Sequence, residues 1–390
     1  MSSGLTAYTC TPRETKAFVI DCMMAGLVPF IQSSPAMGKS AIVAQIAREY
    51  NLKLIDHRLS TSAPEDLSGL PHFKNGVASF VPFDTFPVEG TELPLWPGET
   101  ERKFDAEGNC INCYAGWLLF LDEFNSATKM VQAAAYKLVL DEMVGQTPLH
   151  ANVRIVCAGN LATDRAIVNP ISTAMQSRLI HITMQMLPGA AGVKEFLQDV
   201  ALPQKWDMRI VAYLSYRPGA LHDFRPDHNE KTFCAPRTWE FMHKLIRGKT
   251  FNFVKKMDEN GHPIEVYEME AKAALFAGAI TSGEAVNFIT FTKVFHSLPK
   301  VKDIVDDPTG TTVPTDGATR FATITHLVEH VDDKNFDPIA EYINRFTAEF
   351  RVLFFRALMI QKPELKKHQA FRKAMVDLSR YLHDDIAAAA

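Results

Sequence analysis

The feature that most restricts how this chain can fold is a series of five short apolar runs in its first half, separated by segments with helical spacing of apolar residues. This alternation predicts a parallel sheet with helices on both faces, because strands that run parallel need long crossover connections, which are usually helical. The predicted strands are Val28 to Gln32, Leu52 to Arg58, Trp117 to Leu121, Arg154 to Ala158 and Leu179 to Thr183.

From about Pro188 onward helical spacing dominates, so the chain has at least two domains. A total of 390 residues is long enough for two or three. The stretch from Asp306 to Gly317 is predicted to be a linker or a surface loop. The predicted helices are Gly192 to Val200, Thr238 to Ile246, Glu270 to Ala279 and Phe336 to Ile360.

An insertion at about 71–114 separates the second and third predicted strands and is rich in Pro, Gly and acidic residues. Asn75-Gly76 lies between two extended stretches, which predicts a tight β-hairpin. Long insertions of this kind are more often functional than accidental. Phe73 and Phe80 flank the turn, so we expect this hairpin to contact a partner, or else to pack against a neighbouring subunit.

The segment after the first predicted strand reads Ser33-Ser34-Pro35-Ala36-Met37-Gly38-Lys39-Ser40. It matches the phosphate-loop pattern G-x-x-x-x-G-K-[ST] except at its first position, where Ser33 replaces Gly. Gly38 lets the backbone approach a phosphate, Lys39 offers a positive charge and Ser40 offers a hydroxyl to Mg²⁺. A predicted helix follows from Ser40 to Tyr50, so the N-terminus of a helix would face the phosphates.

Two later strands end in polar residues that could serve the same ligand. The run Gly116 to Leu121 is followed by Asp122 and Glu123, a carboxylate that can hold Mg²⁺ and one that can activate the attacking water. The next strand ends at Asn160, which could orient that water. Two arginines stand at element boundaries, Arg178 before the last core strand and Arg237 at the start of a helix.

Taken in this order, these motifs resemble those of the AAA+ ATPases, and specifically the MoxR-type branch. The resemblance extends over nearly the whole chain. It includes Pro64-Glu65-Asp66-Leu67-Ser68-Gly69, which is similar to the P-x-D-L-x-G stretch of the branch, and Asp122-Glu123-Phe124-Asn125-Ser126-Ala127, which is similar to its D-E-x-N-x-A.

The resemblance implies a role for each candidate residue. Asn160 would be the sensor-one residue, Arg178 an arginine finger that reaches a neighbouring subunit, and Arg237 the sensor-two residue of a helical lid. ATP would bind residues 34–40 with Asp122, and Mg²⁺ would bind Ser40 and Asp122. The chain departs from the family where Ser33 and Ala36 replace glycines, which is costly only if the backbone there needs a positive φ or contacts a phosphate.

The resemblance also implies a P-loop NTPase fold of the AAA+ type, with an α/β nucleotide-binding core at 1–187, a helical lid at 188–299 and a helical C-terminal region at 300–390. The expected activity is Mg²⁺-dependent hydrolysis of ATP by a ring, expected to be hexameric, that remodels a client protein, with von Willebrand factor A domain proteins as candidate clients. Two alternatives remain open, a nucleic-acid motor of the same superfamily and a nucleotide-gated scaffold with little hydrolysis.

The composition bears on three questions: nucleic-acid binding, cellular location and the oxidation state of the cysteines. The net charge of −4 argues against a generally basic surface for nucleic acid, although it leaves a local basic groove open. Charged residues interrupt the N-terminal apolar residues and no run is long enough to span a membrane, so we expect a cytoplasmic protein without a signal peptide.

Six cysteines in a chain of this length favour reduced thiols. Cys110 and Cys113 are spaced as half of a zinc site, or as an exposed hairpin tip.

Overall fold

The computed structural model of this protein describes residues 8–164, 168–257, 262–379 and 381. The chain divides into two compact units, residues 1–186 (unit 1) and 187–390 (unit 2), and each is described by itself. The further division of 188–390 into a lid and a C-terminal region stays a prediction.

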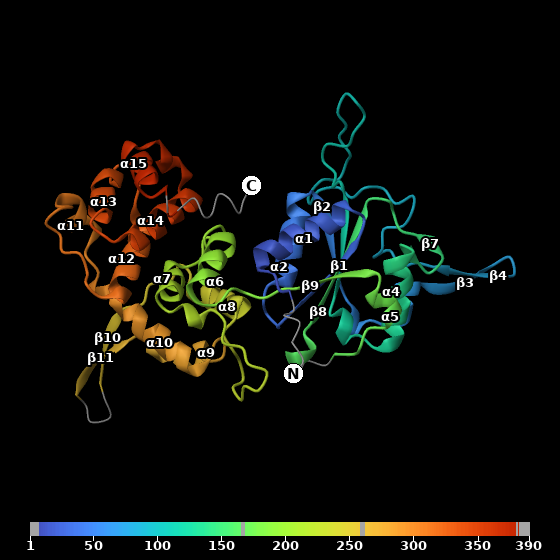
Figure 1. The fold of residues 1–390 in the computed structure, drawn as a ribbon, viewed down its shortest axis with the longest axis horizontal. Coiled ribbons are helices and arrows are strands. Elements are labelled where there is room, and N and C mark those ends of the chain that lie inside the picture. The colour runs from blue at the N-terminus through green and yellow to red at the C-terminus, as the bar shows by residue number, and fades with distance from the viewer. Residues whose placement is uncertain (1–7, 165–167, 258–261, 380, 382–390) are drawn as a thin grey trace, which may run out of the picture. The chain divides into compact units, whose positions relative to one another are not determined.

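Unit 1 is built on a five-stranded parallel sheet in the order β2-β5-β8-β1-β9 (Figure 1). All five predicted strands are confirmed, and several extend slightly further than predicted. Their bounds are β1 Val28–Ser33, β2 Leu52–Arg58, β5 Gly116–Asp122, β8 Val153–Asn160 and β9 Leu179–Thr183.

Helices cover both faces of this sheet, as its apolar strands require. Alternate strand residues point to opposite faces, so Leu118 and Phe120 pack with α1 and α2 while Leu119 and Leu121 pack with α4. The helices of unit 1 are α1 Pro12–Met24, α2 Lys39–Glu49, α3 Pro64–Ser68, α4 Lys129–Leu140 and α5 Thr173–Gln176, with short 3₁₀ turns at Leu59–Thr61, Phe124–Ser126 and Ala162–Asp164.

The strand order places the polar strand ends together. β8 lies between β1 and β5, and its register pairs Asn160 with Ser33 at the end of β1 and Cys157 with Leu121 near the end of β5. Parallel strands end at the same edge of a sheet, so the phosphate loop, Asp122 and Asn160 all belong to the carboxyl edge, where open α/β sheets bind ligands.

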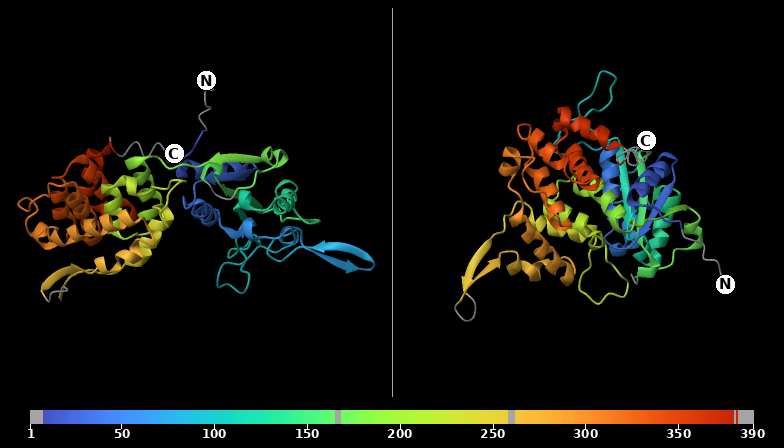
Figure 2. Two further views of the ribbon diagram at one scale, coloured as in Figure 1. Left: turned by 90° about the horizontal axis from the view of Figure 1, so that it is seen from below. Right: turned by 60° about the vertical axis from the view of Figure 1, so that its left-hand side comes forward.

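The predicted hairpin around Asn75-Gly76 is confirmed, with β3 at Leu70–Lys74 and β4 at Val77–Val81. Asn75 and Gly76 have φ values of 52° and 77°, the two positive values that a type I′ turn needs. Figure 1 and the left view of Figure 2 show this hairpin extending from the body of unit 1. A second short hairpin, β6 at Met143–Val144 with β7 at Thr147–Pro148, was not predicted.

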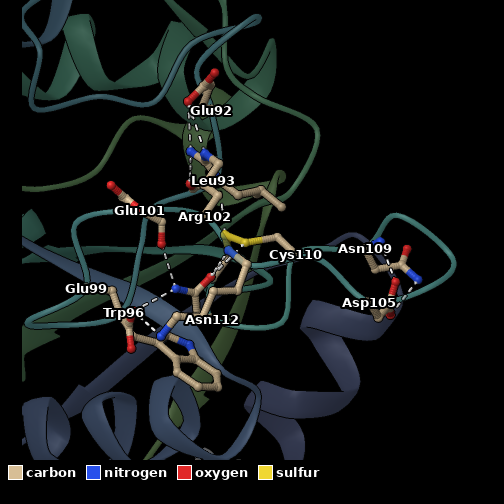
Figure 3. The surroundings of a disulfide bond; sticks show 12 residues. Glu92, Leu93, Trp96, Glu99, Glu101, Arg102, Asp105, Asn109, Cys110 and Asn112 are labelled. Atoms are coloured by element: carbon tan, nitrogen blue, oxygen red, sulfur yellow. Dashed lines mark hydrogen bonds and ion pairs between the residues drawn. A yellow bond between two sulfur atoms is a disulfide. The ribbon is translucent and has the colours of Figure 1, made fainter.

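Cys110 and Cys113 are joined by a disulfide within the insertion (Figure 3). This corrects the expectation of six reduced thiols, although Cys10, Cys22, Cys157 and Cys234 are free as expected. Sulfurs bonded to each other offer no thiolate, so this oxidised form cannot use them as zinc ligands. The pair is not an exposed tip either, because Cys113 is buried and its sulfur accepts a hydrogen bond from Arg102.

Unit 2 is mainly helical, as predicted, so the predicted α/β core with a parallel sheet, followed by a helical region, is confirmed. An antiparallel hairpin that was not predicted extends from these helices, β10 at Phe253–Met257 with β11 at Pro263–Tyr267 (Figure 2). The helices are α6 Gly189–Phe196, α7 Met208–Tyr216, α8 Pro236–Ile246, α9 Ala273–Phe276, α10 Ser282–Lys293, α11 Val301–Asp306, α12 Gly317–His330, α13 Phe336–Ile343, α14 Ala348–Gln361 and α15 Gln369–Asp377, and a π-helical turn continues α6 at Leu197–Ala201.

One prediction for unit 2 needs correction, and for another the structure decides between its two alternatives. The single helix predicted from Phe336 to Ile360 is two helices, since α13 ends at Ile343 and Thr347 is the N-cap of α14. The stretch 306–317 is a surface loop and not a linker, because Arg345 donates hydrogen bonds to the carbonyls of Pro308 and Thr311 and so fixes the loop to the end of α13. In the part of the chain that the structure describes, no helix is long and apolar enough to cross a membrane.

Candidate functional site: a phosphate loop at the edge of the sheet

The loop between β1 and α2 is shaped to receive an anion. Gly38 has a φ of 91° and is the N-cap of α2, and no side chain caps this helix end. The first N–H groups of α2 therefore lack side-chain acceptors, and together with the helix dipole they favour a phosphate at this position.

The two departures from the glycine pattern have different structural costs. Ser33 is the last residue of β1 and is fully buried, so the strand conformation there does not need a glycine. Ala36 has a φ of 61°, in the left-handed region that disfavours a residue with a Cβ. The loop therefore carries backbone strain at Ala36 and none of this kind at Ser33.

Lys39 is turned into the loop and is almost fully buried. Its ammonium donates to the Ser33 hydroxyl at 3.0 Å, to the Ser33 carbonyl at 3.2 Å and to Asn160 Oδ1 at 3.3 Å. Phosphate oxygens would be stronger partners than these neutral ones, because hydrogen bonds between charged groups are the stronger ones.

Ser40 and Asp122 meet across the sheet edge, where the Ser40 hydroxyl donates to Asp122 Oδ2 at 3.4 Å. A hydroxyl and a carboxylate are hard oxygen donors, which are the ligands that Mg²⁺ prefers. The two predicted magnesium ligands, which are far apart in the sequence, are therefore brought together and fit that ion.

Glu123 follows Asp122 with a φ of 55°, so the chain turns sharply at the end of β5. The Ser60 hydroxyl donates to the Glu123 carboxylate and fixes its direction. Ser60 was missed in the sequence, although it lies just after the end of β2, at the same edge as Asp122 and Asn160, the last residues of β5 and β8. Asp56 on β2 joins this acidic group, and burial, then the nearby Asp122, raises the pKa of Asp56.

Asn125 locks the ends of β5 and β8 together. Its side chain is buried, donates to the Asn160 carbonyl at 2.7 Å and accepts from the Asn160 N–H at 3.1 Å. A Cβ on Gly159 would lie 2.2 Å from Asn125 Oδ1, so only glycine fits beside it. The sequence contained Asn125 within a motif, but its role follows only from the structure. This clamp fixes the direction of Asn160 toward Lys39.

Arg178 lies away from the polar residues at the carboxyl edge of the sheet. It lies between α5 and β9, at the amino end of β9, whereas the phosphate loop lies at the carboxyl end of the neighbouring β1. Five strand residues separate the two edges, which is about 16 Å. Arg178 is exposed, and its side chain makes no hydrogen bond or ion pair with any residue that the structure describes.

Arg237 belongs to unit 2, in the first turn of α8, directly after Pro236. Its side chain is exposed. The roles of Arg237, Arg178, Asn160 and Glu123 remain predictions.

No family model matches the sequence, and no curated protein is detectably similar to it. Among solved structures, the chain is similar to a protein from Cytophaga hutchinsonii that is provisionally described as an ATPase, with 15% identity and a TM-score of 0.31. That match covers 48% of this chain and 51% of the other, about half of its length. The chain is also similar to the RuvB Holliday junction branch migration motor of Thermotoga maritima, with 13% identity, a TM-score of 0.29, and 94% and 86% of the two chains covered.

Proposed function

We propose that this chain is a Mg²⁺-dependent ATPase of the AAA+ class and of MoxR type, which works as a hexameric ring and remodels a partner protein. The observation that supports hydrolysis best is the meeting of four side chains at one sheet edge. Lys39 contacts Asn160 at 3.3 Å, and Ser40 contacts Asp122 at 3.4 Å. These are the cation, the polar water-orienting group and the magnesium ligands that phosphoryl transfer requires.

The chemistry follows from these positions. Lys39 exchanges its contacts with Ser33 for phosphate oxygens, and Ser40 and Asp122 hold Mg²⁺, which neutralises phosphate charge when bound. Glu123, directed by Ser60, accepts a proton from the attacking water, while Asn160 holds that water in line. Water is the nucleophile, and ADP and phosphate are the products.

The place of Arg178 supports a ring. At the far edge of its own sheet, this guanidinium cannot reach the phosphates bound by its own loop, but it is exposed and can reach those of a neighbouring subunit. Each site is then completed only at a subunit interface, which makes hydrolysis dependent on assembly.

The β3–β4 hairpin supports a protein client. The exposed fractions of Phe73 and Val77 are 75% and 67%, and Phe80 is also exposed. Exposed apolar clusters of this kind mark interaction surfaces.

Phe73→Ala should lower client-stimulated turnover and leave basal turnover unchanged. Loss of assembly in this variant would instead indicate packing between subunits. A pull-down with Glu123→Gln and a von Willebrand factor A domain protein tests the client class.

Phosphate release measured with Mg²⁺ and ATP tests the activity. Glu123→Gln should slow release by about 100-fold or more and retain ATP, because the water loses its base while the phosphate ligands stay. Glu107→Gln, an exposed acidic residue of the same unit, is the matched control and should be fully active. Turnover in Glu123→Gln equal to that of the wild type would rule out Glu123 as the base.

Mixing two inactive variants tests the shared site. Arg178→Ala should bind ATP and hydrolyse it about 10³-fold more slowly, as for other arginine fingers. Added Lys39→Ala subunits should restore turnover, because they donate Arg178 to neighbours whose own phosphate loops are intact. Mixed rings that form and stay inactive would contradict the shared site without affecting the assignment of Lys39 or Glu123.

A further inference from the structure

Three side chains of metal-ligand type lie on one face of the last turns of α12: His326, Glu329 and His330. Their spacing of i, i+3 and i+4 places them side by side on a helix. One ligand atom from each lies within 4.8 Å of those of the other two, and the imidazole centroids are 4.2 Å apart. All three belong to unit 2, whereas the phosphate loop belongs to unit 1, so a metal site on α12 does not depend on the proposed ATPase activity.

The hydrogen bonding of His330 prepares one of these ligands. Its Nδ1 lies 2.9 Å from the carbonyl oxygen of His326, and because a carbonyl can only accept, Nδ1 carries the proton of this bond. The lone pair of the neutral ring is then on Nε2. Histidines that bind metals are oriented in this way, by donating their other N–H to a carbonyl or carboxylate.

The helix end that carries these residues is held firmly. Lys362 donates to the carbonyls of Glu329 and Val331 at 2.8 and 2.6 Å, and Asn335 donates to the carbonyl of His330 at 3.2 Å. The last carbonyls of a helix are otherwise without partners, and helix ends fray when nothing satisfies them. On the opposite side of α12, Leu327 and Val328 are fully buried. The three ligand side chains therefore project from a fixed backbone.

We propose that His326, Glu329 and His330 bind one Zn²⁺ ion at the C-terminal end of α12. Two imidazole nitrogens and one carboxylate oxygen form a donor set that suits zinc, which binds such ligands at about 2.0–2.2 Å. Donors around a tetrahedral ion lie about 3.4 Å apart, so small side-chain rotations close the site. Glu329 and His330 are exposed, which gives the ion a path from solvent and leaves its remaining position to water.

The charges around the site agree with this assignment. Two cations interact with Glu329: Lys362, whose ammonium is directed at the two helix carbonyls, and Arg209, which pairs with Asp207. Asp332 and Glu364 lie near Lys362 and offset its charge. The spacing His-x-x-Glu-His also occurs in metallopeptidases, where its two histidines bind zinc. We assign only ion binding to this cluster.

Zinc titration of the metal-stripped full-length chain tests the proposal. A chromophoric chelator competes for Zn²⁺, and Co²⁺ is used separately as a spectroscopic probe whose visible absorption reports a tetrahedral site. We expect one ion per chain and a zinc-dependent rise in the melting temperature of unit 2, because an ion that binds only the folded state stabilises it. His330→Ala and Glu329→Gln should each weaken zinc binding by about 10-fold or more.

Two controls make the result specific. His72→Ala changes an exposed histidine of unit 1 and should leave zinc affinity unchanged. All measurements use a Cys110→Ser/Cys113→Ser background, so that these sulfurs cannot bind the ion. Hydrogen exchange of the metal-free variants should match that of the metal-free parent, which separates loss of a ligand from loss of the fold. No saturable binding, or equal affinity in the parent, His330→Ala and Glu329→Gln, would overturn the proposal.

Discussion

In unit 2, Arg209 donates to both carboxylate oxygens of Asp207 at 2.8 and 2.7 Å, and Arg217 pairs with Glu284 at 2.7 Å. At the sheet edge of unit 1, the contacts of Lys39 run from 3.0 to 3.4 Å, and Ser40 contacts Asp122 at 3.4 Å. These short, charge-assisted contacts of unit 2 hold its helices: Arg209–Asp207 closes the start of α7, and Arg217–Glu284 joins the end of α7 to α10. The longer contacts of unit 1, mostly to neutral oxygens, are ones that a ligand can replace. Under the proposed function, this difference separates polar residues that hold the fold from polar residues whose partners a substrate would replace.

The largest effect that this comparison predicts is on the stability of unit 2. Phe355 is fully buried in α14 and its ring packs on Phe354 and Phe371. Phe355→Ala should lower the free energy of unfolding of unit 2 by about 3–5 kcal/mol, because it removes a large apolar side chain and leaves a cavity. Hydrogen exchange resolved by segment measures this, and protection in unit 1 should not change. Val376→Ala, at an exposed position of the same unit, is the control.

Lys39→Ala should have the converse effect: it should weaken ATP binding and change the stability of unit 1 little. We expect the affinity for ATP to fall about 100-fold, because the β/γ-phosphates lose their charge-assisted hydrogen bonds. Titration with a fluorescent ATP analogue measures the affinity, with Lys129→Ala as a control on the same unit. Unchanged ATP affinity would show that Lys39 does not bind the phosphates. Unfolding of the variant would show that the contacts of Lys39 hold the fold, as those of Arg209 and Arg217 do.

A pH effect is predicted for unit 2. His243 is buried, stacks on Trp206, and accepts the Asp207 N–H on Nδ1 at 3.0 Å, which requires the neutral ring. Burial lowers the pKa of His243 below its ordinary value of about 6.5, which the unfolded chain keeps. As the pH falls below about 6.5 the unfolded state takes up a proton first, so the free energy of unfolding falls; above about pH 7.5 it is unaffected. The charged neighbours of this ring are Asp207, Arg247, Glu240 and Lys244.

Urea unfolding of unit 2 between about pH 7.5 and about pH 5 checks this linkage. His243→Gln keeps an acceptor for the Asp207 N–H without the titration. It should reduce the pH dependence, part of which stays with His326 because burial lowers the pKa of that ring too, and it should lower stability at neutral pH. An equal slope in the wild type and this variant would assign the pH effect to other groups.

The smallest predicted effect concerns the two positions where the phosphate loop lacks glycine. Ala36→Gly should stabilise unit 1 by about 1 kcal/mol, because it relieves a left-handed backbone conformation. Ser33→Gly should have the opposite sign, since it adds flexibility at an extended position and removes an acceptor for Lys39. Thermal unfolding of the two variants in parallel measures both. Effects of the same sign would show that φ is not what distinguishes these positions.

The sequence predicted the sheet and the loop because their signals are local. A strand buried on both faces is apolar throughout, as in Gly116–Asp122, and the polar residue that ends it marks the ligand edge. The β10–β11 hairpin was missed because its strands are short and largely exposed, so their apolar residues form no clear run. The residues between them include Asn260-Gly261, the same dipeptide that predicted the first hairpin, so a usable signal was present.

Other features depend on how distant segments meet, which one sequence does not contain. The contact from Ser60 to Glu123 and the disulfide partner of Cys110 are of this kind. The end of α13 at Ile343 was missed because apolar residues continue through Phe346 with helical spacing, although the chain leaves the helix. Periodicity reports which face is buried and does not report where the backbone turns.

The clamp formed by Asn125 links two positions that the chain keeps 34 residues apart. Since a side chain at 159 would occupy the space of the Asn125 amide, position 159 can change only if position 125 becomes smaller, and a change at 125 alone removes both hydrogen bonds to Asn160. In a library of random variants, a single substitution at 125 or at 159 should lower the proposed ATP hydrolysis. Active variants altered at 159 should carry a smaller residue at 125. Positions 125 and 159 should therefore covary among descendants of this sequence. A substitution at Gly159 opposite an unchanged Asn125 would mark a copy in which the proposed turnover is no longer under selection.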